Sequence, residues 1–459
     1  MFTNQVGLGN TLTTISVIGK SFGLTNEGQL SWLIAGYSLT VGTFILIGGR
    51  LGDEFGHKKL FVMGMSWYSL WSLVAGLSVY TSHVLFVFAR VFQGMGPALT
   101  LPNALAILGQ SYSPGPRKHM SFAWFGGSAP FGAIAGFLSG GLFALAWWPW
   151  IYWSQAIALA GVATFAAWTI PHIPVQPRRG RSLRQKIDGL DIPGGLTGVT
   201  ALVLFNFAWN QAVVVDWQQP YVYVCLILGV LFGAAFFYVE VYWAKSPILP
   251  LSSFNADIAF VFACTATGWA CFGIWVFYIG QVALDIGGNT PVQMAAWFIP
   301  VIPSGLVSAL AVGKLLGKIP ASWIMVVGQV AYLAGSILAA TRPPHSIYWT
   351  YYFFSVLIIT VGVDTSFPAA TIIFSNAVPH QYQGMGASIV MTVVNYSTAL
   401  GLGFAGTIET NVNHGGATES ERLSGYRSSL WFSVGLAGLG LALSIIFVVK
   451  PHWQRASKA

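Results

Sequence analysis

Long apolar runs separated by short polar segments recur from one end of the chain to the other. Crossing the hydrocarbon core of a bilayer takes roughly 20 apolar residues in a helix, and most of these runs have about that length. The alternating segments of about ten residues that a membrane β-barrel needs are absent. The pattern therefore predicts an all-α integral membrane protein with about fourteen transmembrane helices, at residues 2–19, 29–49, 60–80, 84–109, 119–144, 147–170, 192–212, 220–243, 257–283, 292–316, 321–340, 347–374, 384–408 and 428–449.

Two of these runs share an internal repeat. In the fourth run Gly96 lies six residues before Pro102, and in the twelfth Gly362 lies six residues before Pro368. "GKLLGK" from Gly313 likewise resembles "GRLGDE" from Gly49. Helices 1–6 then correspond to helices 9–14, with helices 7 and 8 inserted between them, and paired repeats are typical of transporter folds with a midplane substrate site.

This 6+2+6 arrangement predicts four parts of the chain. They are an N-terminal six-helix bundle at 1–171, a basic cytoplasmic loop at 172–190, an inserted helix pair at 191–245, and a C-terminal six-helix bundle with a short cytoplasmic tail at 246–459.

Composition supports the membrane assignment. Charged residues make up 7% of the chain and hydrophobic residues 55%, whereas soluble domains carry roughly 25% charged residues. The net charge of +8 is spread over short clusters between apolar runs, so topology explains it better than nucleic acid binding does. All three cysteines lie inside apolar runs, which predicts neither a disulfide framework nor a metal site.

Loop charges predict the orientation. With the N-terminus in the cytoplasm, sixteen Lys and Arg residues fall in inside segments and four outside, as the positive-inside rule requires. Both termini are then cytoplasmic. No signal peptide is visible, and because polar residues occur in the first run with no tail ahead of it, we expect the first helix to be truncated at its start.

The most concentrated charge lies in "GGRLGDEFGHKK". This stretch fits the motif G-x-x-x-D-x-x-G-x-[KR]-[KR], and it resembles the loop between helices 2 and 3 of the major facilitator superfamily. The resemblance implies a conformational gating role, although a solvated inside loop would explain the two lysines equally well. His57 replaces the arginine usual in the family. The gating residues implied are Gly49, Asp53, Gly56, His57, Lys58 and Lys59.

Arg90 opens "RVFQGMG" in the fourth run. An arginine inside a membrane is costly and usually faces a cavity or a partner, but Arg90 is near enough to the outer end for its side chain to extend to the surface instead. The segment resembles the R-x-x-x-G motif of proton-coupled family members, which implies a role for Arg90 in proton coupling.

The fifth run carries "GGSAPFGAIAGFLSGG". Gly132, Gly136 and Gly140 recur every four residues and form a smooth stripe for close helix packing. Together with Pro130 they resemble the antiporter motif of drug:proton exporters, although Ala129 departs from it. Tight packing without a transport role is the alternative.

Asp364, in "GVDTS", is the one acidic residue that the pattern places well inside a run. Burial disfavours the charged form of a carboxyl, which suits a group that gains and loses a proton. A neutral or paired structural acid is the alternative.

Other polar and aromatic residues within the runs are candidates for a substrate cavity, since each could contact a bound molecule or else join helices. They are Asn10, Thr14, Gln93, Asn103, Trp124, Trp275 and Asn395.

The inserted pair opens with "GLDIPGGLTGVTALVLFNFAWNQAVVVDW" from Gly189, and the first run contains "NQVGLGNTLTTISVIG". Together they resemble the fungal fourteen-helix drug:proton antiporter branch, which includes aminotriazole-resistance and low-affinity ammonium transporters, and the resemblance covers nearly the whole chain. The resemblance implies proton-coupled export of small hydrophobic or cationic compounds by alternating access, with ammonium uptake as the alternative and a non-transporting nutrient sensor as a weaker one. It implies a monomer in the plasma membrane, with the vacuolar membrane as the alternative location. The implied partners are a small-molecule substrate, protons and the lipid bilayer. The proton gradient drives transport, and no cofactor is implied.

A membrane enzyme is not indicated, because all eight histidines fall in loops or at helix ends without a cluster. No Walker A sequence occurs, so an ATP-driven pump is not indicated either.

Overall fold

The computed structural model describes residues 1–24, 27–112, 116–171, 190–244, 247–248, 254–315, 318–377 and 386–456. Within these ranges it contains thirteen helices long and apolar enough to cross a membrane. The α-helices of the first half are α1 (Phe2–Leu12), α2 (Ile15–Ser21), α3 (Glu27–Phe55), α4 (His57–Leu77), α5 (His83–Ser111), α6 (Pro116–Ala146) and α7 (Pro149–Thr169). Those that follow are α9 (Ile192–Val215), α10 (Pro220–Tyr238), α11 (Ala256–Gln281), α12 (Pro291–Trp297), α13 (Val301–Leu315), α14 (Ala321–Ala340), α15 (Tyr352–Ala377), α16 (Gly386–Val412) and α17 (Glu419–Ala456).

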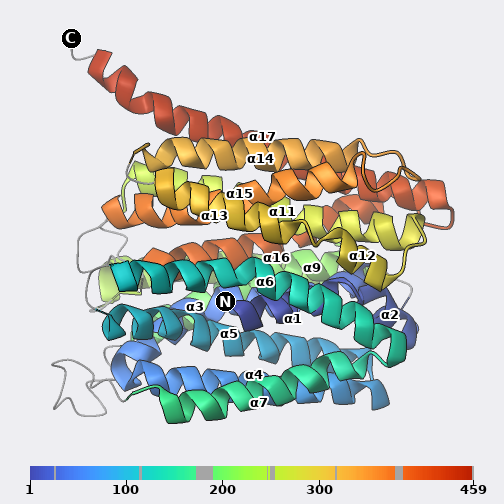
Figure 1. Ribbon diagram of the computed structural model, residues 1–459, viewed down its shortest axis with the longest axis horizontal. Coiled ribbons are helices and arrows are strands. Elements are labelled where there is room, and N and C mark those ends of the chain that lie inside the picture. The colour runs from blue at the N-terminus through green and yellow to red at the C-terminus, as the bar shows by residue number, and fades with distance from the viewer. Residues whose placement is uncertain are drawn as a thin grey trace.

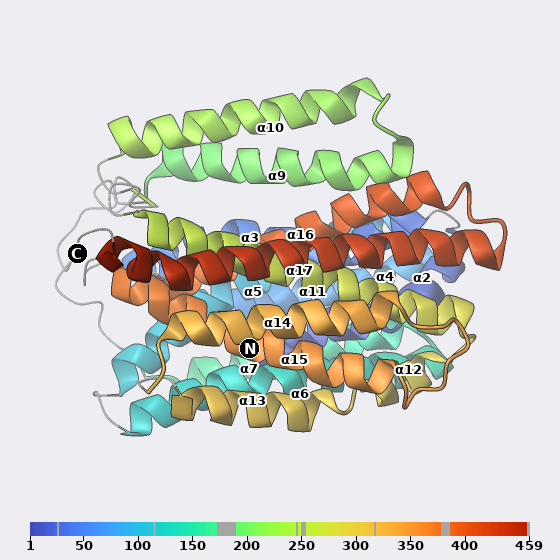
Figure 2. The same ribbon diagram turned by 90° about the horizontal axis from the view of Figure 1, so that it is seen from above.

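The helices form two bundles that lie side by side. Figure 1 shows α1–α7 below and α11–α17 above, with the helix axes roughly parallel. The bundles meet where α3 packs on α16 and where α6 packs on α12 and α13. Figure 2 shows α9 and α10 as a pair at one edge, outside both bundles. The fold class predicted from the sequence is therefore confirmed.

Two predicted runs are broken, and one loop is shorter than expected. The first run divides at Thr13 and Thr14 into α1 and α2, and the tenth divides into α12 and α13. The expected outer loop 409–427 is mostly helical, because α16 continues to Val412 and α17 begins at Glu419.

The internal repeat is visible in equivalent helix contacts. A Cβ at Gly96 would lie 3.0 Å from the Gly64 carbonyl oxygen and 2.5 Å from the Tyr68 side chain. In the second bundle a Cβ at Gly362 would lie 3.0 Å from both the Gly328 carbonyl oxygen and the Tyr332 ring. The α4–α5 pair and the α14–α15 pair thus use the same close glycine contact beside a tyrosine.

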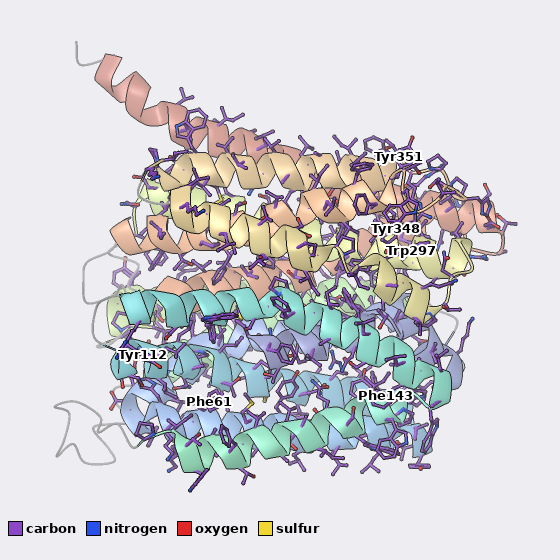
Figure 3. The ribbon with its side chains drawn as sticks, viewed as in Figure 1. Phe61, Tyr112, Phe143, Trp297, Tyr348 and Tyr351 are labelled. Carbon is purple, nitrogen blue, oxygen red and sulfur yellow. The ribbon has the colours of Figure 1, made fainter. Side chains whose placement is uncertain are left out.

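Aromatic side chains gather at one end of the second bundle. Trp297 and Tyr348 stack with ring centroids 5.3 Å apart, and Figure 3 shows them near Tyr351, at the opposite end of the molecule from Tyr112. Tryptophan and tyrosine favour the boundary between lipid and water, so this cluster suits an interfacial position.

Candidate functional site

Arg90 is fully buried on α5. Its Nε donates to the Leu33 carbonyl oxygen on α3 at 3.1 Å, and its Nη2 donates to the Gly7 carbonyl oxygen on α1 at 3.0 Å. Its Nη1 donates to Gln93 Oε1 one turn further along α5. The side chain therefore does not extend to the membrane surface, and it joins three helices of the first bundle.

Two tyrosine rings flank the Arg90 guanidinium. Its central carbon lies 4.5 Å from the centroid of the Tyr37 ring and 5.8 Å from that of Tyr152. Cation–π contacts of this kind stabilise a desolvated arginine. The tyrosines extend the polar network, since Tyr37 and Tyr68 share a hydrogen bond of 3.0 Å and Gln155 donates to Tyr68 at 3.0 Å.

Asn10, Thr14 and Gln93 belong to this network rather than to an exposed surface. Asn10 donates to Gln155 at 3.1 Å, Thr14 donates to the Asn10 carbonyl at 2.7 Å, and Gln93 donates to Ser72 at 2.7 Å. No local sequence pattern marks Tyr37 and Tyr152 as partners of Arg90, because they lie on other helices.

Asp364 lies near the middle of α15, and its Oδ2 atom is buried without a hydrogen-bond partner in the described part of the chain. A Cβ at Gly305 of α13 would lie 2.8 Å from this Oδ2 and 3.0 Å from the Pro130 ring of α6. Asp364 and Pro130 thus approach the same glycine from opposite bundles. Gly305 was not identified from the sequence.

The glycine stripe of α6 packs on α1. A Cβ at Gly132 would lie 2.4 Å from the Phe2 carbonyl oxygen, at Gly136 2.6 Å from that of Val6, and at Gly140 2.6 Å from that of Asn10. Side chains at these positions would push the two backbones apart, which gives the four-residue spacing its physical reason.

The motif at residues 49–59, to which the family resemblance assigns a gating role, lies at the junction of α3 and α4. His57 Nδ1 lies 2.8 Å from Asn103 Oδ1, and His57 Nε2 lies 3.6 Å from Asp53 Oδ1. Gly56 has a φ of 100°, a conformation that glycine adopts readily and other residues rarely do.

Asn103 fastens this junction to α5. Its amide donates to the carbonyl oxygens of Gly48 at 3.0 Å and Leu99 at 2.6 Å. A Cβ at Gly52 would lie 1.8 Å from Asn103 Oδ1, so Gly52 is a further glycine that this contact requires. Of the two lysines in the motif, Lys58 is partly buried and Lys59 is exposed.

The remaining cavity candidates have different surroundings. Trp275 is buried and donates to Ser355 Oγ at 2.8 Å, and Asn395 donates to Met391 of its own helix at 2.9 Å. Trp124 is 70% exposed. Among the described residues, the hydrogen bonds and ring contacts of Trp275 and Asn395 are to other side chains and to the backbone of their own bundle.

Several acidic residues expected in loops or at helix ends are buried. Asp364 was the only acid expected well inside, yet Glu54, Asp191, Glu240 and Glu409 are each less than 9% exposed. Helix ends pack against neighbouring elements here, and a sequence pattern does not reveal that packing. No group of three or more potential metal ligands occurs among the described residues.

Two repeated bundles of membrane-length helices, with charged side chains such as Arg90 and Glu409 buried inside them, define a membrane transport protein. Comparison with known proteins identifies the family. The Major Facilitator Superfamily model matches residues 1–299. The efflux pump terG of Aspergillus terreus is 58% identical over 457 residues, which cover 99% of this chain and 86% of terG. The low affinity ammonium transporter of Saccharomyces cerevisiae is 51% identical over 448 residues, covering 96% and 85%.

Solved structures share the fold at low sequence identity. A POT family transporter in complex with a thioalcohol conjugated peptide has a TM-score of 0.72 at 14% identity, covering 98% of this chain and 94% of that one. A bacterial homolog of the human lysosomal transporter Spinster, inward-facing and unoccupied, has a TM-score of 0.65 at 14% identity, covering 97% and 94%.

The chain therefore belongs to the Major Facilitator Superfamily. It is a multi-pass membrane transporter of small molecules and not an enzyme. Its relatives include efflux pumps, an aminotriazole resistance protein and a low affinity ammonium transporter, the fungal group that the sequence motifs indicated.

Proposed function

We propose that this transporter exports small hydrophobic or cationic compounds in exchange for protons, with α1–α7 and α11–α17 alternating about a midplane site. Two efflux pumps of Aspergillus terreus, 58% and 42% identical, support export. The observation that carries proton exchange is the buried, unpartnered Oδ2 atom of Asp364 at the contact with Gly305.

A buried carboxylate oxygen without a hydrogen-bond partner disfavours the charged form, and we therefore propose that Asp364 holds a proton while its Oδ2 atom is buried. The contact among Pro130, Gly305 and Asp364 lies between the bundles, and rocking of the bundles changes the exposure of the carboxyl. Water then stabilises the charged form and the proton leaves. An inward proton gains about 2.3 kcal/mol per 100 mV of membrane potential.

Arg90 acts as the fixed charge of the first bundle in this proposal. Its contacts with Gly7 and Leu33 hold α1 and α3 in register with α5. A proton arriving at Asp364 removes the opposite charge from the second bundle. The proton gradient takes the place of a cofactor.

The loop charges and the family support one arrangement of the protein in the cell. We propose a plasma-membrane monomer with both termini cytoplasmic, divided into parts at 1–171, 172–190, 191–245 and 246–459. The Gly49, Asp53, Gly56, His57, Lys58 and Lys59 motif then lies at the cytoplasmic ends of α3 and α4. The carboxyl ends of α7 and α17 lie at the same end of the molecule (Figure 1). In this proposal that end faces the cytoplasm.

Uptake of ammonium is the second candidate. It is favoured by the 51% identity to the low affinity ammonium transporter of Saccharomyces cerevisiae. Accumulation of labelled methylammonium by cells that express the protein distinguishes uptake from export, because an exporter would not increase the amount accumulated.

Sealed inside-out vesicles with an imposed pH gradient test the main proposal. A panel of hydrophobic cations is offered, and Asp364→Asn is compared with Glu409→Gln, which alters another buried carboxyl of the second bundle but keeps an acceptor for Tyr278. We expect Asp364→Asn to abolish pH-driven accumulation and Glu409→Gln to retain it. Full pH-driven transport by Asp364→Asn at normal expression would refute the assignment.

A further inference from the structure

The peptide group between Pro247 and Ile248, on the segment that joins α10 to α11, is held from both sides. Arg50 Nη2, on α3, donates to the Pro247 carbonyl oxygen. The Ile248 amide donates to Glu240 Oε1, just beyond α10, at 3.2 Å. The carbonyl and the amide belong to one planar peptide unit. Arg50 therefore binds the negative end of the peptide dipole and Glu240 binds the positive end. Both hydrogen bonds are charge-assisted.

The surroundings of this peptide group are closely packed. Ile248 and Glu240 are each 5% exposed. A Cβ at Gly195 of α9 would lie 3.6 Å from Ile248 Cδ1 and 3.7 Å from Ile47 Cδ1 of α3. A Cβ at Gly194 would lie 3.0 Å from Glu240 Oε1. The ends of α3, α9 and α10 thus meet at the held peptide.

Arg50 also has a particular place in the chain. It directly follows Gly49, the first residue of the gating motif. A Cβ at Gly49 would lie 3.9 Å from Ser388 Oγ of α16, so this end of α3 is part of the seam between the bundles. Contacts that fix the position of Arg50 therefore also affect how α3 packs against α16.

Helix α9 of the inserted pair packs on both helices of this seam. Trp209 of α9 and Phe404 of α16 have ring centroids 4.4 Å apart, and Tyr396 of α16 donates to the Leu202 carbonyl oxygen of α9 at 3.1 Å. Phe207 of α9 lies against Trp32 of α3 with centroids 5.7 Å apart. Helix α9 therefore contacts both α3 and α16, as its place in Figure 2 allows.

We propose that Arg50 and Glu240 are positioning residues that anchor the inserted helix pair to the end of α3 through the 247–248 peptide. The anchored pair holds α3 against α16 and keeps Gly49 beside the partly buried Ser388. The inserted helices thus control gating rather than contact the substrate. This role does not depend on the substrate or on the coupling ion.

The test uses purified protein in lipid nanodiscs, with Cys225, Cys264 and Cys271 replaced and a reporter Ser388→Cys. The rate of maleimide labelling at position 388 measures how often the seam opens. We expect Arg50→Gln and Glu240→Leu, which leaves the Ile248 amide without its side-chain acceptor, each to raise the rate about tenfold, the effect of losing one hydrogen bond to a charged group. The double variant should be no faster than either single one, because both side chains act on one peptide. Arg50→Lys, which retains a cationic donor, should restore much of the slow rate.

Two controls separate anchoring from general loosening. Arg117→Gln removes an exposed arginine and should leave the rate unchanged. A second reporter, Ser429→Cys, is fully buried on α17 and should label no faster in any variant. An unchanged rate at position 388, an equal rise at position 429, or additive effects in the double variant would each overturn the proposal.

Discussion

The Pro130 ring on α6 lies against the backbone of Gly305 on α13, so closely that a Cβ at Gly305 would be 3.0 Å from Pro130 Cγ. The contact joins the two bundles beside the Asp364 carboxyl. Gly305 therefore sets how closely the bundles approach at the proposed proton site.

Gly305→Ala should reduce transport sharply with little change in expression. The added methyl group would lie 2.8 Å from Asp364 Oδ2, and overpacking of this kind costs about 1–3 kcal/mol. We expect the rate of pH-driven transport to fall by about tenfold, the equivalent of ~1.4 kcal/mol. Gly313→Ala, on the same helix with nothing within 4 Å of its Cβ, is the matched control. Equal activity of the two variants would contradict the prediction.

Replacing Arg90 should destabilise the first bundle. Arg90→Met leaves the Gly7 and Leu33 carbonyls without these donors, and hydrogen bonds to charged groups contribute about 1.5–3 kcal/mol each. We expect the thermal midpoint of purified Arg90→Met to fall by several degrees. The midpoint of Arg90→Lys should fall less, because lysine keeps a cationic N–H donor group. Arg117→Met, at an exposed arginine, should leave the midpoint unchanged. A stable Arg90→Met variant that transports normally would show that Arg90 neither stabilises the first bundle nor takes part in proton exchange.

The two asparagines Asn103 and Asn395 should differ in their contribution to stability. Asn103→Ala removes contacts to His57, Gly48 and Leu99 and should cost about 2–3 kcal/mol, because buried partners lose their hydrogen bonds. Asn395→Ala removes one bond within its own helix and should cost less than about 1 kcal/mol. Thermal unfolding in detergent measures both, and the reverse order would show that Asn103 is not part of the gating junction.

Tyr278 should stabilise the second bundle through Glu409. Its hydroxyl donates to Glu409 Oε2 at 2.7 Å, and Glu409 is 2% exposed. Tyr278→Phe leaves a buried carboxyl short of a donor, which costs about 1–3 kcal/mol. Tyr348→Phe is the comparison, since the partly buried Tyr348 donates only to the Trp297 carbonyl and its loss should cost less. Equal thermal midpoints for the two variants would argue against a structural role for Glu409.

Much of the candidate site consists of contacts between different helices, which a local sequence pattern does not predict. The Arg90 charge was recognised as unusual from the sequence, but its partners Tyr37 and Tyr152 lie on other helices. Glu240 falls at the end of a predicted helix, and its burial depends on Gly194 of α9 and on the Ile248 amide packing against it. Gly305 had no distinguishing motif and became meaningful only through its neighbours.

The sequence by itself determined the membrane class, the repeated bundles, the inserted pair and the family. Each follows from the length of apolar runs and from motifs with fixed spacing, which are properties of short segments. Only the tertiary structure decided that the first helix breaks at Thr13 and Thr14, that Asp364 and Pro130 meet at Gly305, and that Arg50 and Glu240 hold one peptide. These features join residues from different helices, and such contacts depend on how whole helices pack against one another.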